Sequence, residues 1–441
     1  MPDDIKILNQ YQQITDEICR PLFKPTTKLW FFAFFPGIAG IIIGIYGVYC
    51  TFYKGIGTWG LNRTVGWGWA ITNFVWWIGI GHAGTFISAI LLLFRQEWRT
   101  GINRAAETMT IFAILCAAVF PVIHMGRVEF AFFAFPYPNT RNLWVNFNSP
   151  LLWDVFAIST YFIVSLIFWY IGMIPDLAVL SGGKAKKIKR KIYSALSLGW
   201  QGTAFDWKRH EKTMILLASL ATPLVISVHS VVSMDFATSI IPGWHSTIFP
   251  PYFVAGAIFS GFAMVQTLVI ITRKILKLEN YITLKHIDSM NKIILLTGSM
   301  VALAYVVEAF YAIYSGNEFE EFVLLNRATG PFALGFWIMI FCNMIIPQLF
   351  WFKKIRRNIR ITFLFSLLIN FGMWMERFTI ITVSLQRDFM PSNWAYYRPT
   401  FVEVALFIGT IGLFFTLYLL FLRLFPVVSF SEIKHQIKEN E

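Results

Sequence analysis

Ten hydrophobic runs, each long enough to cross a bilayer, divide this chain from Leu29 to Phe425. A helix needs roughly 20 mostly apolar residues to span a hydrocarbon core about 30 Å thick, and several runs exceed that length, so some tilt is expected. The sequence therefore predicts an all-α polytopic membrane protein with ten transmembrane helices. The predicted spans are residues 29–53, 66–94, 104–124, 150–175, 212–235, 251–273, 291–315, 331–352, 361–383 and 400–425.

Basic residues lie almost entirely on alternate connections between these runs. Of the 37 Lys and Arg residues, 29 lie on the set that includes both chain ends, 7 lie on the other set, and Arg377 lies inside the ninth run. By the positive-inside rule, both termini are expected in the cytoplasm. The net charge of +13 is then mostly an orientation signal, and a nucleic-acid partner is not expected.

The longest basic tract runs from Lys184 to Lys191 in the connection after the fourth run. Its simplest interpretation is a solvated cytoplasmic loop that touches anionic lipid. The sequence assigns it no other role.

The regions outside the membrane are short. The chain is expected to comprise a cytoplasmic segment (1–28), a membrane domain (29–425) and a cytoplasmic tail (426–441), because the longest connections, 125–149 and 176–211, hold too few apolar residues for a core. The first 28 residues lack the basic-then-apolar pattern of a cleaved signal, so the first span is expected to be retained.

The four cysteines are far apart and never form a C-x-x-C motif. Cys19, Cys50, Cys116 and Cys342 therefore encode neither an iron–sulfur cluster nor a disulfide framework. No metal site is expected in this chain.

Ionisable residues inside the predicted spans are functional candidates, because charge is costly in a bilayer. With the orientation above, five of them fall in the outer part of the membrane, from four different helices. They are His124, Asp154, His229, Asp235 and Arg377.

A histidine and carboxylates beside an arginine can bind a quinol head group and remove its protons, since imidazole accepts a proton near neutral pH. We expect Arg377 to line this pocket. The plainer alternatives are that His124 and Asp154 sit in headgroup water and that Asp235 pairs with Arg377 in a buried salt bridge.

A second set of ionisable residues lies deeper or on other helices: His82, Glu107, Glu308 and Glu376. Chains of acidic residues and histidines relay protons across membrane bundles, so these four are candidates for a proton relay. The alternative is that Glu376 and Glu308 only neutralise Arg377.

Haem is another use for membrane histidines, which can ligate it from two helices. His82 is expected near the middle of the membrane or toward the cytoplasm, whereas His229 and His124 are expected outside the midplane. These mismatched depths argue against haem.

Several strings resemble the polysulfide-reductase membrane-subunit (NrfD-like) superfamily, and within it the larger quinol-oxidising membrane subunit of bacterial alternative complex III. The resemblance is dense from about residue 55 to 170. It is supported more thinly by residues 227–235 and 373–377. The strings are Gly57-Thr-Trp-Gly-Leu-Asn62, Trp69-Ala-Ile-Thr-Asn-Phe-Val-Trp-Trp-Ile-Gly-Ile-Gly-His-Ala-Gly84, Phe120-Pro-Val-Ile-His-Met-Gly-Arg127 and Leu143-Trp-Val-Asn-Phe-Asn-Ser-Pro-Leu-Leu-Trp-Asp154.

The resemblance implies two four-helix bundles, spans two to five and six to nine, flanked by the first and last spans, in a bacterial inner membrane. It implies a protein without a redox centre that binds menaquinol near the periplasmic face, where His124, Asp154, Asp235 and Arg377 line the site, and that translocates protons. The implied partners are a periplasmic iron–sulfur subunit, multihaem cytochrome subunits and a second NrfD-like membrane subunit.

Three functional hypotheses follow. The first is a subunit of a quinol:electron-acceptor oxidoreductase. The second is a secondary transporter, although such proteins place their sites near the midplane, whereas the ionisable groups here gather near one face. The third is a structural anchor for a molybdopterin-type reductase, which would leave Asp235 and Arg377 no purpose beyond pairing.

Overall fold

The computed structural model describes residues 2–127, 129–130, 147–183 and 186–439. This part of the chain is helical and contains no strand. Ten of its helical runs are long and apolar enough to cross a membrane, which confirms the predicted fold class and number of spans.

The spans follow the predicted runs closely. In chain order they are α2 (Lys28–Lys54), α3 (Trp69–Thr85) with η2 (Phe86–Ile90) and α4 (Leu91–Leu93), α5 (Asn103–His124), α6 (Pro150–Gly182), α8 (Ala204–Ala237), α9 (Phe249–Leu276), α10 (Leu284–Tyr314), α12 (Ala333–Ile340) with η5 (Phe341–Ile345), α13 (Ile346–Gln348) and η6 (Leu349–Trp351), α15 (Ile359–Phe378) with η7 (Thr379–Val383), and α16 (Phe401–Leu424).

The remaining helices lie at the ends of the spans. They are α1 (Pro2–Phe23), η1 (Ile56–Thr58), η3 (Glu97–Arg99), α7 (Lys187–Leu196), α11 (Glu318–Thr329), α14 (Lys353–Arg356), η8 (Pro391–Asn393) and α17 (Phe430–Glu439).

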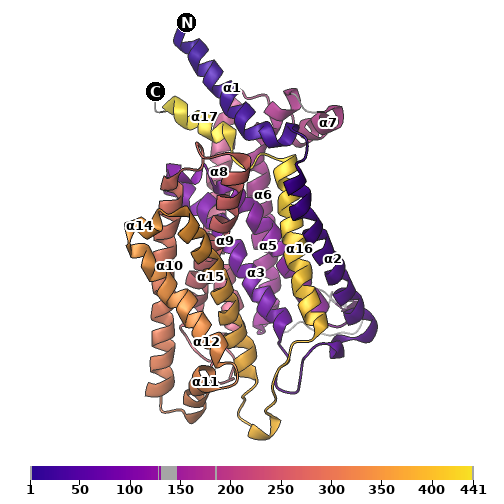
Figure 1. Ribbon diagram of the computed structural model, residues 1–441, viewed down its shortest axis with the longest axis vertical. Helices are drawn as coiled ribbons and strands as arrows, with labels where there is room; N and C mark the ends of the chain where they lie inside the picture. Colours follow the sequence, from indigo (N-terminus) through magenta and orange to yellow (C-terminus); the bar gives the residue numbers. More distant parts are fainter. Residues whose placement is uncertain (1, 128, 131–146, 184–185, 440–441) are drawn as a thin grey trace.

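Both chain ends lie at the same end of the molecule, beside α1, α7 and α17 (Figure 1). We call this end the terminal face and the other end the opposite face. Because the spans alternate in direction, α5 ends and α6 begins at the opposite face, where α8 also ends.

The spans form two groups that meet along α3 and α9. In the first half, α3 packs on α5 and α6 packs on α8. In the second half, α9 packs on α10 and α15, and α12 packs on α15. This agrees with the expected grouping of spans two to five and six to nine.

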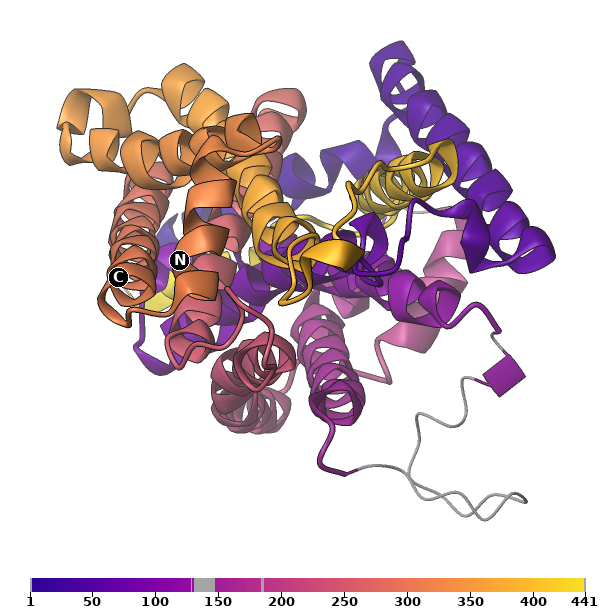
Figure 2. The same cartoon turned by 90° about the horizontal axis from the view of Figure 1, so that it is seen from below.

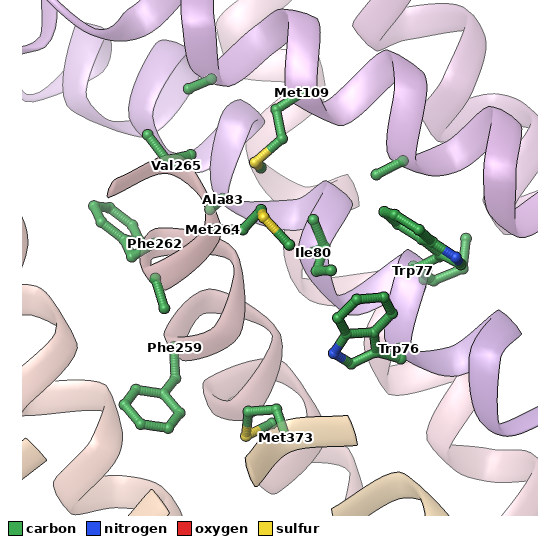
Figure 3. Packing of buried hydrophobic residues seen from close by; sticks show 14 of the residues in the cluster. Trp76, Trp77, Ile80, Ala83, Met109, Phe259, Phe262, Met264, Val265 and Met373 are labelled. Carbon is green, nitrogen blue, oxygen red and sulfur yellow. The ribbon is translucent and has the colours of Figure 1, made fainter. Parts of the chain in front are cut away.

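The contact between α3 and α9 is the centre of the molecule, and both helices are mostly buried within the protein. Small residues let the two backbones approach closely: a Cβ added at Gly261 would lie 2.5 Å from the Cβ of Ala83. Large side chains such as Trp76, Phe259 and Met373 fill the space around this contact (Figure 3).

Spans α2 and α16 form a separate pair on the side of the molecule away from α10 and α14 (Figures 1 and 2). A Cβ added at Gly44 would lie 2.5 Å from the Cα of Gly409, so the backbones touch. Most of the remaining surface of α2 is not covered by protein, as expected for a lipid-facing first span.

The expected loop 176–211 is mostly helical, which corrects the prediction. Helix α6 continues to Gly182 because Asp176, one residue beyond the predicted span, is fully buried and paired with Arg104 of α5. The chain then forms α7 before α8 begins at Ala204, ahead of the predicted 212.

Two expected features fall partly outside the described residues. These are the predicted outer loop, of which 128 and 131–146 are not described, and the basic tract, of which Lys184 and Ala185 are not described.

Candidate functional site

The structure divides the predicted site residues among several places. Asp154 and Asp235 form one group, His82 and His229 form a second, and Glu376 and Arg377 form a third. His124, Glu107 and Glu308 each lie elsewhere.

Asp154 and Asp235 come together near the opposite face. Asp154 lies in the first turns of α6, which opens with Pro150, and Asp235 lies in the last turn of the neighbouring helix α8. Their carboxyl groups are close enough for a hydrogen bond. In each group, Oδ1 is buried without a hydrogen-bond partner among the described residues.

Two carboxylates in contact repel each other, so such a pair is most stable when it holds one shared proton. The pair therefore has the chemistry to accept a proton and to release it toward the adjacent membrane surface.

His82 of α3 and His229 of α8 are in direct contact, fully buried between the helices. The distance from His229 Nδ1 to His82 Nε2 is 3.2 Å, and the ring centroids are 4.1 Å apart. The expectation that these histidines lie at mismatched depths is wrong. Counting residues from helix ends assumes that the ends are level, and helices as different in length as α8 and α3, with 34 and 17 residues, do not meet that assumption.

The hydrogen bonds fix the tautomers of this pair in its neutral form. His82 Nδ1 lies 2.8 Å from the carbonyl oxygen of Ile78, which can only accept, so Nδ1 carries the hydrogen. His82 Nε2 is then an acceptor, and His229 Nδ1 must donate to it. His229 Nε2 is consequently a bare acceptor, and it is buried with no partner in the described structure.

A chain of hydroxyl groups leads from this pair toward the terminal face. The ring of Tyr161 stacks on His82 at 5.0 Å, and its hydroxyl is 2.6 Å from Thr85 Oγ1. Thr85 lines a cavity just large enough for a water molecule, together with Glu107 and Ser165. Glu107, in the second turn of α5, thus lies at the end of this polar path nearer the terminal face. This position is compatible with a role in a proton relay.

Arg377 lies 18 residues into α15, about 27 Å along the helix from the terminal face and directly before the π-helical turn η7. It is almost completely buried. Its Nη1 is 2.6 Å from Glu376 Oε1, and its guanidinium lies over the ring of Phe253 at 4.2 Å. Gly256 of α9 leaves room for this group, since a Cβ there would lie 3.2 Å from Arg377 Nη2.

The sequence suggested ion pairs of Arg377 with Glu376 and with Asp235. The pair with Glu376 forms, and the pair with Asp235 does not. Glu376 is also held on its other oxygen: Tyr305 donates a hydrogen bond to Oε2, and Asn343 Nδ2 lies 2.9 Å from the Tyr305 hydroxyl. Arg377 Nη2 has no hydrogen-bond partner in the described structure, and Arg377 is within electrostatic reach of His229.

Glu308 does not neutralise Arg377. It pairs instead with Arg327 of α11, whose Nη1 is 2.7 Å away. Arg327 also donates to Gly243 O and Ser384 Oγ, at 3.1 and 2.8 Å, and so ties three segments together near the opposite face.

His124 ends α5 at the opposite face, as predicted. Its Nε2 is 3.1 Å from the carbonyl oxygen of Gly66, and its ring lies 5.7 Å from that of Trp59. None of its described contacts joins it to Asp154 or Asp235.

Sequence reasoning missed Tyr161, Tyr305 and Asn343, which complete the buried polar groups. These uncharged side chains carry no insertion cost large enough to draw notice in a hydrophobic run. Asp176 was missed because it fell just outside the predicted span, although an acidic residue so near a long apolar run is itself a signal.

Comparison with known proteins adds a family. The family described as "Polysulphide reductase, NrfD" matches residues 58–387, which includes every candidate residue discussed above.

Three curated proteins are similar to this chain over most of their length. A putative dimethyl sulfoxide reductase membrane subunit of Halobacterium salinarum is 23% identical over 83% of this chain and 85% of its own. A selenate reductase subunit of Mesobacillus selenatarsenatis is 21% identical over 90% and 94%. An Hdr-like menaquinol oxidoreductase integral membrane subunit of Archaeoglobus fulgidus is 20% identical over 86% and 89%.

Proposed function

This chain belongs to the polysulphide reductase NrfD family, and we propose that it is the quinol-oxidising membrane subunit of a respiratory oxidoreductase complex. The finer assignment is to a complex of the alternative complex III type, which uses menaquinol. The proposed orientation places both termini in the cytoplasm and the opposite face in the periplasm of a bacterial inner membrane.

The observation that carries the proposal is the contact between Asp154 and Asp235. Oxidation of one quinol releases two electrons and two protons. The carboxyl pair can take one proton from a quinol hydroxyl and pass it to the nearby membrane surface, and the free Nε2 of His229 can accept the second. The two electrons go to a partner subunit with an iron–sulfur centre.

Arg377 and His229 supply further polar groups between the two halves of the molecule. His229 Nε2 is a bare acceptor, and Arg377 Nη2 is an unpartnered donor. A quinol hydroxyl that donates to the former and a quinone carbonyl that accepts from the latter would both be satisfied. His124 is proposed as a further contact at the opposite face.

Proton movement through the first half is part of the proposal. The path runs from Glu107 through Thr85 and Tyr161 to His82 and His229. Glu107 and Thr85 share a water-sized cavity, and hydrogen bonds join Thr85 to Tyr161 and His82 to His229. Tyr161 and His82 are in contact through stacked rings, so a proton would cross this step only after one of the two side chains moves. Glu308 and Glu376 are paired with Arg327 and Arg377. Each carboxylate must therefore lose its attraction to an arginine before it can relay a proton.

The proposed partners are a periplasmic iron–sulfur subunit, multihaem cytochrome subunits and a second NrfD-like membrane subunit.

Two relatives are named as subunits of reductases, one of dimethyl sulfoxide and one of selenate. They favour a second candidate, in which the same quinol site delivers electrons to a terminal reductase. Identification of the subunits that copurify with the tagged chain distinguishes the two complexes.

The test of the quinol site is to replace each carboxyl group in the intact complex. Asp154→Asn and Asp235→Asn are expected to slow quinol-driven electron transfer by about 10²- to 10⁴-fold, because each removes a proton acceptor. Glu321→Gln, which alters an exposed acidic residue of α11 near the same face, is the matched control.

Assembly should be near normal in all these variants, measured as the amount of complex in membranes. Wild-type turnover in assembled Asp154→Asn and Asp235→Asn would refute the site. His124→Ala is measured in the same assay, and normal turnover there removes His124 from the site.

A further inference from the structure

Most of the basic tract after the fourth span lies in helix α7, which has one edge against the protein and two exposed edges. The exposed basic edge carries Lys187, Arg190 and Lys191, and the exposed apolar edge carries Ile188 and Ile192. In α7, Lys189 and Tyr193 face the protein, one turn apart. Ile188 and Ile192, also one turn apart, are 76% and 49% exposed. A helix with an apolar edge and a strongly basic edge is typical of a helix that lies in a membrane surface.

The position of α7 is fixed by contacts with the end of a transmembrane span. Tyr193 donates to the carbonyl oxygen of Leu424 at 2.7 Å, and Lys189 Nζ donates to that of Arg423 at 3.2 Å. Both acceptors lie in the last turn of α16, where the span ends. Helix α7 therefore lies at the level where hydrocarbon gives way to headgroups, on the terminal face (Figure 1).

The positive charge of this region is not balanced by the protein. No ion pair between described residues involves Lys186, Lys187, Lys189, Arg190 or Lys191. The single acidic residue from Leu177 to His210 is Asp206, which caps α8 through the backbone of Thr203. Burial, and then the charges of Arg423 and Lys186, lower the pKa of Lys189. The absence of ion pairs and the cations around Lys189 both indicate an excess of positive charge in this region.

Exposed apolar side chains continue beyond the helix, on the connection that follows it and in the first turn of α8. Leu198 and Phe205 are 69% and 65% exposed. A soluble loop gains nothing from such exposure, whereas the same side chains in the acyl region of a leaflet bury apolar surface.

We propose that α7 is an interfacial helix that binds anionic phospholipid in the leaflet at the terminal face, with Ile188 and Ile192 among the acyl chains and Lys187, Arg190 and Lys191 on the phosphates. The occupant is a lipid and not an acidic protein, because the apolar edge lies at the depth of the bilayer surface. This role is independent of the quinol site.

The first experiment measures anionic lipid bound to the intact, purified complex. Complexes in nanodiscs of phosphatidylcholine with phosphatidylglycerol are recovered in detergent, and retained lipid is counted by native mass spectrometry. The variant Lys187→Gln/Arg190→Gln/Lys191→Gln is expected to lower retained phosphatidylglycerol by about fivefold for each cation removed. The control is Lys285→Gln/Lys353→Gln/Lys354→Gln, which removes three exposed cations elsewhere on the same face.

A second experiment measures the depth of α7. A spin label at Ile192→Cys is expected to meet membrane-soluble oxygen more often than a water-soluble nickel complex, and a label at Ser194→Cys should show the reverse. The four native cysteines are buried.

Equal lipid loss in the basic-edge variant and the control would overturn the proposal, as would a label at Ile192 that is open to water. The proposal would also be overturned if the basic-edge variant retained its lipid but lost a copurifying subunit. That result would assign α7 to an acidic protein partner.

Discussion

The central buried polar groups of the two halves of the membrane domain differ in character. In the first half, His82 contacts both His229 and Tyr161, and Nε2 of His229 has no partner among the described residues. In the second half, Glu376 and Arg377 form an ion pair, and Tyr305 and Asn343 hold the carboxylate.

The difference separates a group that can change its protonation from a group that is held in one state. A neutral histidine with a free acceptor nitrogen can bind a proton without breaking an existing hydrogen bond. A buried carboxylate beside an arginine must lose its attraction to that charge before it takes up a proton. We therefore expect the first half to move protons and the second half to hold fixed charge beside the quinol pocket.

The largest expected effect tests the first half. His229→Gln keeps a hydrogen-bonding side chain but removes the proton acceptor. It should slow quinol-driven turnover by about 10²- to 10⁴-fold while the complex remains assembled. His245→Gln, in the connection between α8 and α9, is the control. Normal turnover in assembled His229→Gln would remove the main distinction between the halves.

The next effect tests the fixed charge of the second half. Arg377→Leu leaves the buried carboxylate of Glu376 without its cation, which costs about 3–5 kcal/mol for a buried pair and should lower the amount of complex in membranes. The double variant Glu376→Gln/Arg377→Leu should recover much of that amount, because no charge is left behind.

The same variants also test whether Arg377 lines the quinol pocket. Arg377→Lys retains the charge but loses the planar, forked hydrogen bonding, so it should assemble better than Arg377→Leu and still bind quinol weakly. Normal apparent quinol affinity in assembled Arg377→Lys would restrict Arg377 to a structural role.

The smallest effect compares two buried tyrosines, one from each half. Tyr305→Phe removes a donor to a charged carboxylate and should destabilise the complex by about 1.5–3 kcal/mol with near-normal turnover. Tyr161→Phe removes a hydroxyl that bonds Thr85 and the carbonyl oxygen of Gly81, and it should slow turnover with a smaller loss of stability. Heat denaturation and turnover of both purified variants measure this, and the reverse pattern would exchange the roles of the halves.

The fold was largely predictable because its determinants are local. Ten apolar runs of sufficient length became ten spans, and an even number of spans places both termini on one face. The exception depended on a tertiary contact. Asp176 carried α6 past its predicted end, since its pairing with Arg104 of α5 allows a charged residue to be buried.

The sequence predicted which residues form the candidate site but not which of them contact one another. The ends at which His124, Asp154 and Asp235 lie followed from their positions along the helices. The contact of His82 with His229 contradicted the expected depths, and Glu308 was found on Arg327 instead of Arg377.

What the sequence determined by itself is the class, the spans and the end of the membrane domain near which His124, Asp154 and Asp235 lie, because hydropathy and length are properties of a single segment. Only the tertiary structure decided which residues meet. Partners depend on the tilt and rotation of each helix against its neighbours, and those are fixed by close contacts between helices distant in sequence, such as Gly261 against Ala83.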